Sequence, residues 1–152
     1  MSDQTDKDVD HGPRFRLKIR SPAILSTHVE CWKCADMTPV ICLAGREPDG
    51  TLGDVNNIVA VSPELEQVLS DFPLFQPLFS RTTGSTTYAN MCAACGALQG
   101  QHFMHSQPGG PFFAVHAREA ELTVIPIEGP TEVTVDLEPY HDLGDWRSAD
   151  GA

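Results

Sequence analysis

The sequence predicts an α+β, β-rich domain built around a zinc-ribbon-like four-cysteine site. The first observation is a pair of Cys-x-x-Cys motifs with identical spacing, at Cys31–Cys34 and Cys92–Cys95. The second is a set of short apolar runs, one of which alternates with basic residues as a strand with one wet face does. The third is the content of 12 Gly and 12 Pro in 152 residues, which is typical of a turn-rich chain. We expect antiparallel strands, one or two short helices, and a site that joins two cysteine knuckles.

The length of the chain suits a single domain. With 41% hydrophobic residues, the chain has enough apolar side chains to form a core. Residues 1–12 are rich in Asp and are expected to form a disordered acidic tail. We place the single zinc-binding domain at residues 13–140 and a polar C-terminal tail at residues 141–152.

The strands are predicted from apolar runs and the turns from Gly, Pro and Asn. Basic and apolar residues alternate over 14–20, which predicts a first strand with one wet and one buried face. A second extended run, 23–29, leads into the first cysteine pair. The segment 46–57 carries several turn residues and is predicted to be a loop or hairpin tip. Further strands are predicted at 40–44, 58–61, 88–91, 112–115, 122–127 and 131–137.

Two helices are predicted. Ser62 is a good N-cap, Pro63 suits the first helical turn, and Pro73 ends the helix. A second short helix is predicted at 97–105, after the second cysteine pair. The remaining segments are read as an apolar stretch punctuated by Pro at 72–79, a Ser/Thr/Gly loop at 80–87 and a turn at 107–111.

The two cysteine pairs predict one structural zinc ion. Four thiolates satisfy a tetrahedral ion, and zinc–sulfur bonds of about 2.3 Å leave little slack between the two arms. In each pair the amides between the cysteines can turn toward the sulfurs, and Gly96 suits the left-handed residue that closes such a turn. The predicted ligands are Cys31, Cys34, Cys92 and Cys95. Iron remains open as the ion, because four thiolates accept both metals.

Three other interpretations of the cysteines stay open. The pairs can be redox-active, although the βαβ context usual for such motifs is missing. They can also be reduced core cysteines without metal. Finally, His28 and Glu30 followed by Cys92-x-x-Cys95 superficially match the zinc deaminase pattern, but that pattern leaves Cys31 and Cys34 unexplained.

Three further groups of residues are candidates for function. Cys42 lies in an apolar run and is expected to be a buried small side chain. Gln99, His102 and His105 would share one side of the predicted helix and form a polar site or second metal site. The phenylalanines of the apolar stretch would form a partner patch if exposed. The patch residues are Phe72, Phe75 and Phe79.

Charge limits the classes of partner. The formal net charge is −11, which repels nucleic acid and anionic lipid unless a local basic patch overrides it. The strand at 14–20 supplies the one cationic cluster, which is either a nucleic-acid-binding face or the charged edge strand of a sheet. Its basic residues are Arg14, Arg16, Lys18 and Arg20. No apolar run is long enough to cross a membrane. We expect a cytoplasmic location, where thiols stay reduced, and another protein as the partner.

The segments 30–34 and 88–100, with the continuation from His105 to Phe113, resemble bacterial zinc-ribbon-type proteins of uncharacterised function. The run Cys-Gly-Ala-Leu-Gln-Gly is the most particular part of this resemblance. The resemblance implies one zinc ion held by the four paired cysteines, and it carries no activity.

We therefore expect a non-catalytic zinc-binding protein that acts through protein–protein contacts, with no catalytic residue. A zinc ribbon that binds nucleic acid through the strand at 14–20 is one alternative. A zinc- or thiol-dependent enzyme that uses Glu30 or the pair His102 and His105 is the other.

Overall fold

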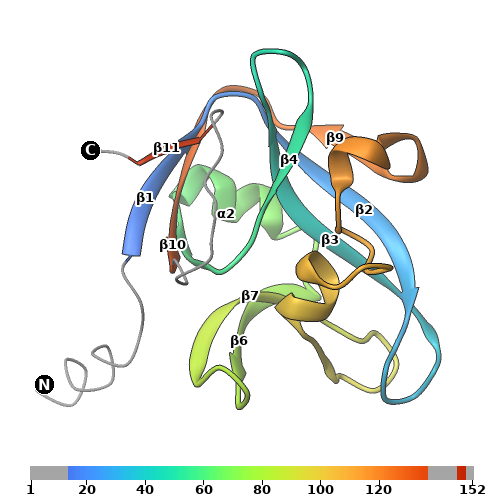
Figure 1. The fold of residues 1–152 in the computed structure, drawn as a ribbon. Coiled ribbons are helices and arrows are strands. Elements are labelled where there is room, and N and C mark those ends of the chain that lie inside the picture. Colours follow the sequence, from blue (N-terminus) through green and yellow to red (C-terminus); the bar gives the residue numbers. More distant parts are fainter. Residues whose placement is uncertain (1–13, 137–146, 150–152) are drawn as a thin grey trace, which may run out of the picture.

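The computed structural model describes residues 14–136 and 147–149, which form three antiparallel sheets and a few short helices (Figure 1). The β-rich α+β class is therefore confirmed. Residues 1–13, 137–146 and 150–152 lie outside the described part, and so do the predicted acidic tail and most of the predicted C-terminal tail. None of the helices in the described part has the length and apolar character needed to span a bilayer.

The first sheet has the strand order β11-β1-β10-β5. Its strands are β1 (Arg14–Ile19), β5 (Ile58–Val61), β10 (Thr131–Asp136) and β11 (Arg147–Ala149). The predicted alternation of β1 is confirmed, since Leu17 and Ile19 are fully buried and the basic residues are exposed. However, β1 lies between β10 and β11, so its charged face is not that of an edge strand. β11 lies in the segment that is predicted to be a polar tail. The sequence does not indicate this strand, because a three-residue strand between polar segments has no apolar pattern.

The second sheet has the order β4-β3-β2-β9. Its strands are β2 (Pro22–Glu30), β3 (Met37–Arg46), β4 (Leu52–Val55) and β9 (Thr123–Pro126). β2 and β3 pair along their whole length, and the turn of this long hairpin holds the first cysteine pair. The segment 46–57, predicted to be a loop, contains the strand β4. The sequence does not indicate this strand, because only its residues Leu52 and Val55 are buried and the residues between them look like a turn.

The second sheet is buried on both faces, which explains the continuous apolar run of β3. Ile41 and Leu43 point into the main core, which also receives side chains from β1, β5 and β10. Val40, Cys42 and Ala44 point to the opposite face, into a second core closed by Phe112 and Val115. Alternate residues of one strand thus serve two cores.

The third sheet is small and has the order β6-β7-β8. Its strands are β6 (Phe75–Ser80), β7 (Ser85–Met91) and β8 (Leu98–Gln99), and the turn between β7 and β8 holds the second cysteine pair. Figure 1 shows the β6–β7 hairpin in the lower part of the molecule, below helix α2. The predicted apolar stretch at 72–79 thus becomes a strand that buries Phe75 in the main core.

The predicted helix is α2 (Pro63–Leu69), and its predicted cap is confirmed. The Ser62 hydroxyl oxygen accepts a hydrogen bond of 3.2 Å from the backbone amide of Leu65. Leu65 and Leu69 are the buried residues of this helix and pack into the main core. The helix therefore closes one end of the core that the first two sheets share.

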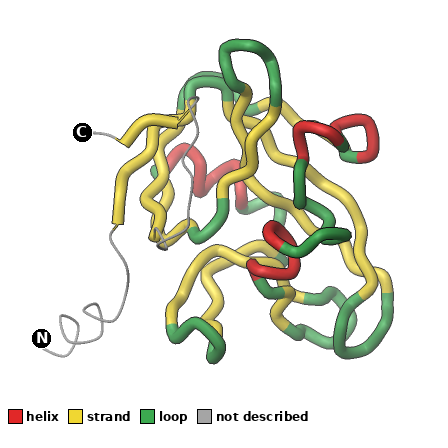
Figure 2. The backbone as a smooth tube through the Cα atoms, viewed as in Figure 1, coloured by secondary structure: helices red, strands yellow, loops and turns green. Residues whose placement is uncertain are grey.

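Two predicted elements are wrong. The helix predicted at 97–105 is replaced by β8 and a π-helical turn at His102–Ser106, coloured as a short helix in Figure 2. The strand predicted at 112–115 is a set of turns followed by 3₁₀ turns at Val115–Ala117 and Glu119–Glu121. Ala114 has a φ of 54°, a left-handed conformation that no strand accepts. The apolar character of Phe112 and Val115 comes from their burial in the second core.

Candidate metal centre

The first cysteine knuckle, Cys31–Asp36, is the tip of the β2–β3 hairpin. The amide of Cys31 donates a 2.8 Å hydrogen bond to the Asp36 carbonyl, and the amide of Ala35 donates one of 2.9 Å to the Cys31 carbonyl. The amide of Lys33 points at the Cys31 sulfur at 3.3 Å. Ala35 has a φ of 69°, so it holds the left-handed position that closes the turn without being glycine.

The second knuckle, Cys92–Ala97, repeats the same arrangement between β7 and β8. The amide of Cys92 donates 2.9 Å to the Ala97 carbonyl, and the amide of Gly96 donates 2.9 Å to the Cys92 carbonyl. The amide of Ala94 points at the Cys92 sulfur at 3.3 Å. Gly96 has a φ of 79°, which confirms the conformation predicted for this glycine. In both knuckles an amide between the cysteines faces sulfur, as the spacing predicts.

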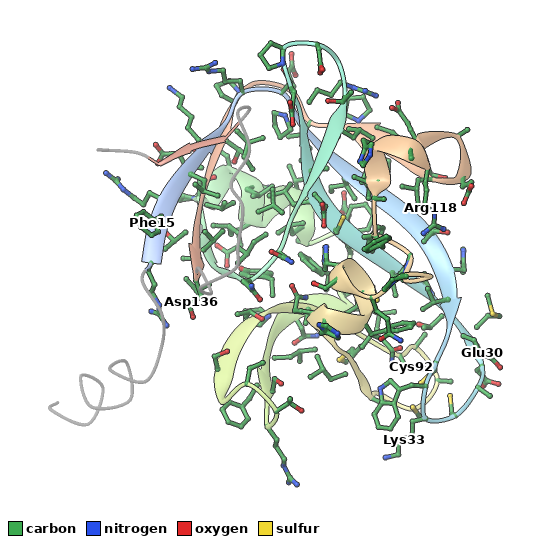
Figure 3. All side chains as sticks on the ribbon, viewed as in Figure 1. Phe15, Glu30, Lys33, Cys92, Arg118 and Asp136 are labelled. Carbon is green, nitrogen blue, oxygen red and sulfur yellow. The ribbon has the colours of Figure 1, made fainter. Side chains whose placement is uncertain are left out.

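The two knuckles bring all four sulfurs into one group. The Sγ atoms lie within 4.8 Å of one another. The sulfurs of Cys31 and Cys95 are 3.7 Å apart, and those of Cys34 and Cys92 are also 3.7 Å apart. A tetrahedral ion with metal–sulfur bonds of about 2.3 Å requires sulfur–sulfur distances of about 3.8 Å. The four cysteines are therefore positioned to coordinate a metal ion. In Figure 3, Cys92 and Lys33 lie in the same corner of the molecule, although they are far apart in the sequence.

Hydrogen bonds between the sheets hold the knuckles in this relation. The buried Asn90 side chain donates 2.9 Å to the Ile41 carbonyl and accepts 2.9 Å from the Ile41 amide, so it pairs with β3 as a strand would. The Trp32 indole donates 2.6 Å to the Leu98 carbonyl, which links one knuckle to the other. The amide of Ala93 donates 3.0 Å to the hydroxyl of the buried Thr38. Sequence patterns give no signal for these contacts, because each joins residues at least 49 positions apart.

Gln99 belongs to the cysteine cluster. It is fully buried, and its Nε2 donates 3.4 Å to the Cys31 sulfur and 3.0 Å to the Ala97 carbonyl. Its Oε1 has no hydrogen-bond partner among the described residues. The predicted grouping of Gln99 with His102 and His105 is therefore replaced by a contact with sulfur.

The local electrostatics favour thiolate at two of the four cysteines. The pKa of Cys31 is lowered to about 6, chiefly because the backbone amide of Cys34 points at its sulfur, with smaller help from Lys33 and Gln99 against the effect of burial. The pKa of Cys92 is lowered mainly by the amide of Cys95. At Cys34 the amide of Asp36 favours the thiolate, but burial and the neighbouring thiols outweigh it and raise the pKa to about 12. Full ionisation of the cluster thus needs a cation.

His28 and Glu30 do not join the cluster. Both are exposed on β2, and the only group of potential ligands in the described part of the chain consists of the four cysteines. The deaminase-like set of His28 with Cys92 and Cys95 is therefore not assembled. Four sulfurs around one ion leave no coordination position for a substrate or a water molecule.

The predicted histidine site is also not assembled as one group. His105 is almost buried, and its Nδ1 lies 2.5 Å from the Asp54 carboxylate, while its ring stacks at a tilt on Phe112. His102, on the same π-helical turn, is exposed. His105 thus ties the turn to β4 as part of the packing around the second core.

The other candidate residues lie away from the metal centre. Cys42 is 1% exposed in the second core, and burial raises its pKa well above the ordinary value, as expected of a packing residue. Within the predicted partner patch, Phe75 is buried in the main core and Phe72 packs against that core. Phe79 is exposed, so the three side chains do not form one surface.

The basic residues of β1 face acidic neighbours. Arg14 forms an ion pair with Asp136 at 3.0 Å, and Lys18 lies opposite Glu132 in the adjacent strand β10. In Figure 3, Asp136 lies at the lower end of the first sheet, close to where β1 begins. These carboxylates reduce the positive potential that a nucleic-acid-binding face requires.

Comparisons with protein-family models, with curated proteins and with solved structures found no match for this chain.

Proposed function

We propose that this protein is a non-catalytic zinc-binding protein whose single structural ion joins the two knuckles in the manner of a zinc ribbon, and that it acts through contacts with another protein. The observation that carries the proposal is the set of four sulfurs within 4.8 Å of one another, with two pairs of them 3.7 Å apart and amides directed at two of the sulfurs. Such a site is closed, since every coordination position is taken by the chain. A closed site stabilises a fold and does not activate water.

Zinc is preferred here to iron because a structural role needs no redox chemistry, although four thiolates accept both ions. The protein-contact role is supported by the net charge of −11 and by the ion pair between Arg14 of β1 and Asp136. Both observations disfavour the alternative of a nucleic-acid-binding ribbon.

The test is metal analysis of the purified full chain together with two cysteine variants. We expect about one zinc per chain in the wild type, loss of the zinc in Cys92→Ser, and retention of it in Cys42→Ala. Cys42 is the matched control because it is as buried as Cys92 but lies in the second core. A red protein with a visible thiolate-to-iron absorption band would show that the bound ion is iron and not zinc. A colourless wild type without any metal would refute the proposal.

A further inference from the structure

A cavity of about 620 Å³ lies beside the first knuckle. Three segments form its walls: residues 27–30 of β2, the first knuckle with Met37, and the loop region that carries Phe103 and Arg118. Figure 3 shows Glu30 and Arg118 on the same side of the molecule, along the outer part of β2. The cavity therefore borders the metal centre, and Cys31 belongs to both.

The cavity runs along an open strand edge. β9 pairs with β2 only from Ala23 to Ser26, whereas β3 pairs with all of β2 on the other side. Figure 1 accordingly shows β9 beside the part of β2 that is farther from the knuckle. In the described part of the chain, no strand pairs with the outer edge of residues 27–30.

The lining confirms that the edge faces the cavity. Four consecutive residues, Thr27 to Glu30, contribute to the wall. Successive side chains of a strand point to opposite faces, so a cavity over one face of the sheet would meet only alternate residues. A cavity that meets all four lies along the edge, where the backbone amides and carbonyls of the strand are accessible. An exposed strand edge is a template for a further strand.

The cavity also has apolar anchors. Trp32 is 67% exposed and Met37 is 62% exposed, and both line it. Val29 and Phe103 add half-buried apolar surface that continues into the second core. Exposed large apolar side chains gathered beside a groove are typical of a contact surface.

The charge of this region favours a cationic occupant. Glu30 has no ion-pair partner among the described residues, whereas Arg118 is paired with Glu121 at 3.1 Å and donates 2.6 Å to the Gly110 carbonyl. A divalent ion held by four thiolates would leave two net negative charges behind the first knuckle. The whole chain carries −11, so an acidic segment would be repelled.

We infer that the outer edge of Thr27–Glu30 binds an extended, cationic segment of a partner protein as an added strand, with an apolar side chain of that segment resting on Trp32 and Met37. Main-chain hydrogen bonds would supply affinity, and the alternate side chains would supply specificity. This inference rests on the proposed function, because the proposed ion would hold the first knuckle, which forms one wall of the groove.

The test is an NMR titration of the zinc-loaded full chain, labelled with ¹⁵N, with a capped hexapeptide of alternating Lys and Val. We expect shifts at the amides of Thr27–Glu30 and slowed exchange at those of His28 and Glu30, which face away from β3. A matched hexapeptide N-methylated at every residue keeps the charge and side chains but lacks strand donors. A second control peptide replaces every Lys by Glu. Each control should bind at least about tenfold more weakly, a loss of about 1.4 kcal/mol.

Substitutions in the protein locate the contact. Met37→Ser and Glu30→Gln should each weaken binding of the Lys/Val peptide several-fold. Phe79→Ser is the control for Met37→Ser, since Phe79 is also 62% exposed but lies on β6. Glu128→Gln is the charge control. Met37 and Phe79 are both mostly exposed, so we expect neither serine substitution to unfold the protein.

The outcomes separate the two proposals because the zinc content is measured on the same samples. Zinc-loaded protein that binds the N-methylated or the acidic peptide as well as the Lys/Val peptide overturns the added-strand inference and leaves the metal site intact. Concentration-dependent shifts of the same amides without peptide also overturn it, because a second copy of this chain would then occupy the edge. Protein that carries no metal but still binds the peptide refutes the proposed metal site alone.

Discussion

The two knuckles have the same hydrogen bonds and very different supports. Knuckle 1, Cys31–Asp36, ends a hairpin of nine- and ten-residue strands rooted in two cores. Knuckle 2, Cys92–Ala97, is followed by a strand of two residues, β8. The first turn is thus held by the sheet beneath it, whereas the second depends on cross-links: the proposed metal ion, Thr38 and the Trp32 indole. The same local turn can therefore be held in place by its own hairpin or only by contacts with another segment.

Metal removal should show this difference most strongly. With a chelator, amide exchange should accelerate much more at Cys92–Gln99 than at Cys31–Asp36, because the long hairpin persists without the ion. If free zinc is a thousandfold above its Kd, the ion stabilises the fold by about 4 kcal/mol. The melting temperature should then fall by about 8–16 °C, as measured by calorimetry. Equal acceleration at both knuckles would refute the proposed difference in support.

The next largest effect should come from Asn90, which docks the third sheet on β3. Asn90→Ala leaves the buried amide and carbonyl of Ile41 unpaired. Each such group costs about 1–3 kcal/mol, so urea unfolding should show a loss of about 2–6 kcal/mol. Thr86→Ala, at an exposed position of the same strand β7, is the control and should change stability little. An unchanged midpoint for Asn90→Ala would contradict the docking role of this side chain.

The left-handed residues of the two knuckles allow a reciprocal pair of substitutions. Gly96 has a φ of 79° and open space where a Cβ would lie, so Gly96→Ala should cost only the backbone strain, about 1–2 kcal/mol. Ala35→Gly relieves the same strain at 69° but makes the unfolded chain more flexible, so it should be neutral or stabilise by less than about 1 kcal/mol. Thermal unfolding of the zinc-loaded variants tests both signs, and a destabilising Ala35→Gly would contradict the equivalence of the two turns.

The smallest effect should occur at the far end of the knuckle 1 hairpin. Arg46, the last residue of β3, lies 2.6 Å from Glu119 and lowers the pKa of that carboxyl. A folded pKa below the unfolded value means that the pair stabilises the protein above about pH 4.5, and that this stability is lost as the pH falls through the folded pKa. Because the pair is at the surface, Glu119→Gln should lower the melting temperature only slightly at pH 7, and this difference should shrink as the pH falls through the folded pKa of Glu119.

Much of this architecture could be predicted from local patterns. The alternation of β1, the cap of α2 and the left-handed Gly96 are confirmed, since each depends on residues only a few positions apart. The buried position of Cys42 followed from its apolar run in the same way. The predicted helix at 97–105 failed because β8 pairs with β7 across the knuckle. The predicted strand at 112–115 failed because the second core, rather than a sheet, buries its apolar residues.

By itself, the sequence determined the chemistry of the centre. Two Cys-x-x-Cys turns present sulfur whatever surrounds them, because the spacing of the residues sets the turn. Only the tertiary structure decided that sulfurs of the two turns lie 3.7 Å apart, and that the Gln99 side chain donates to a sulfur instead of joining a histidine pair. It also decided that Phe75 is buried, whereas Trp32 and Met37 are exposed beside an open edge. The physical reason is that such contacts join segments far apart in the chain, and their free energy depends on which surfaces pack together.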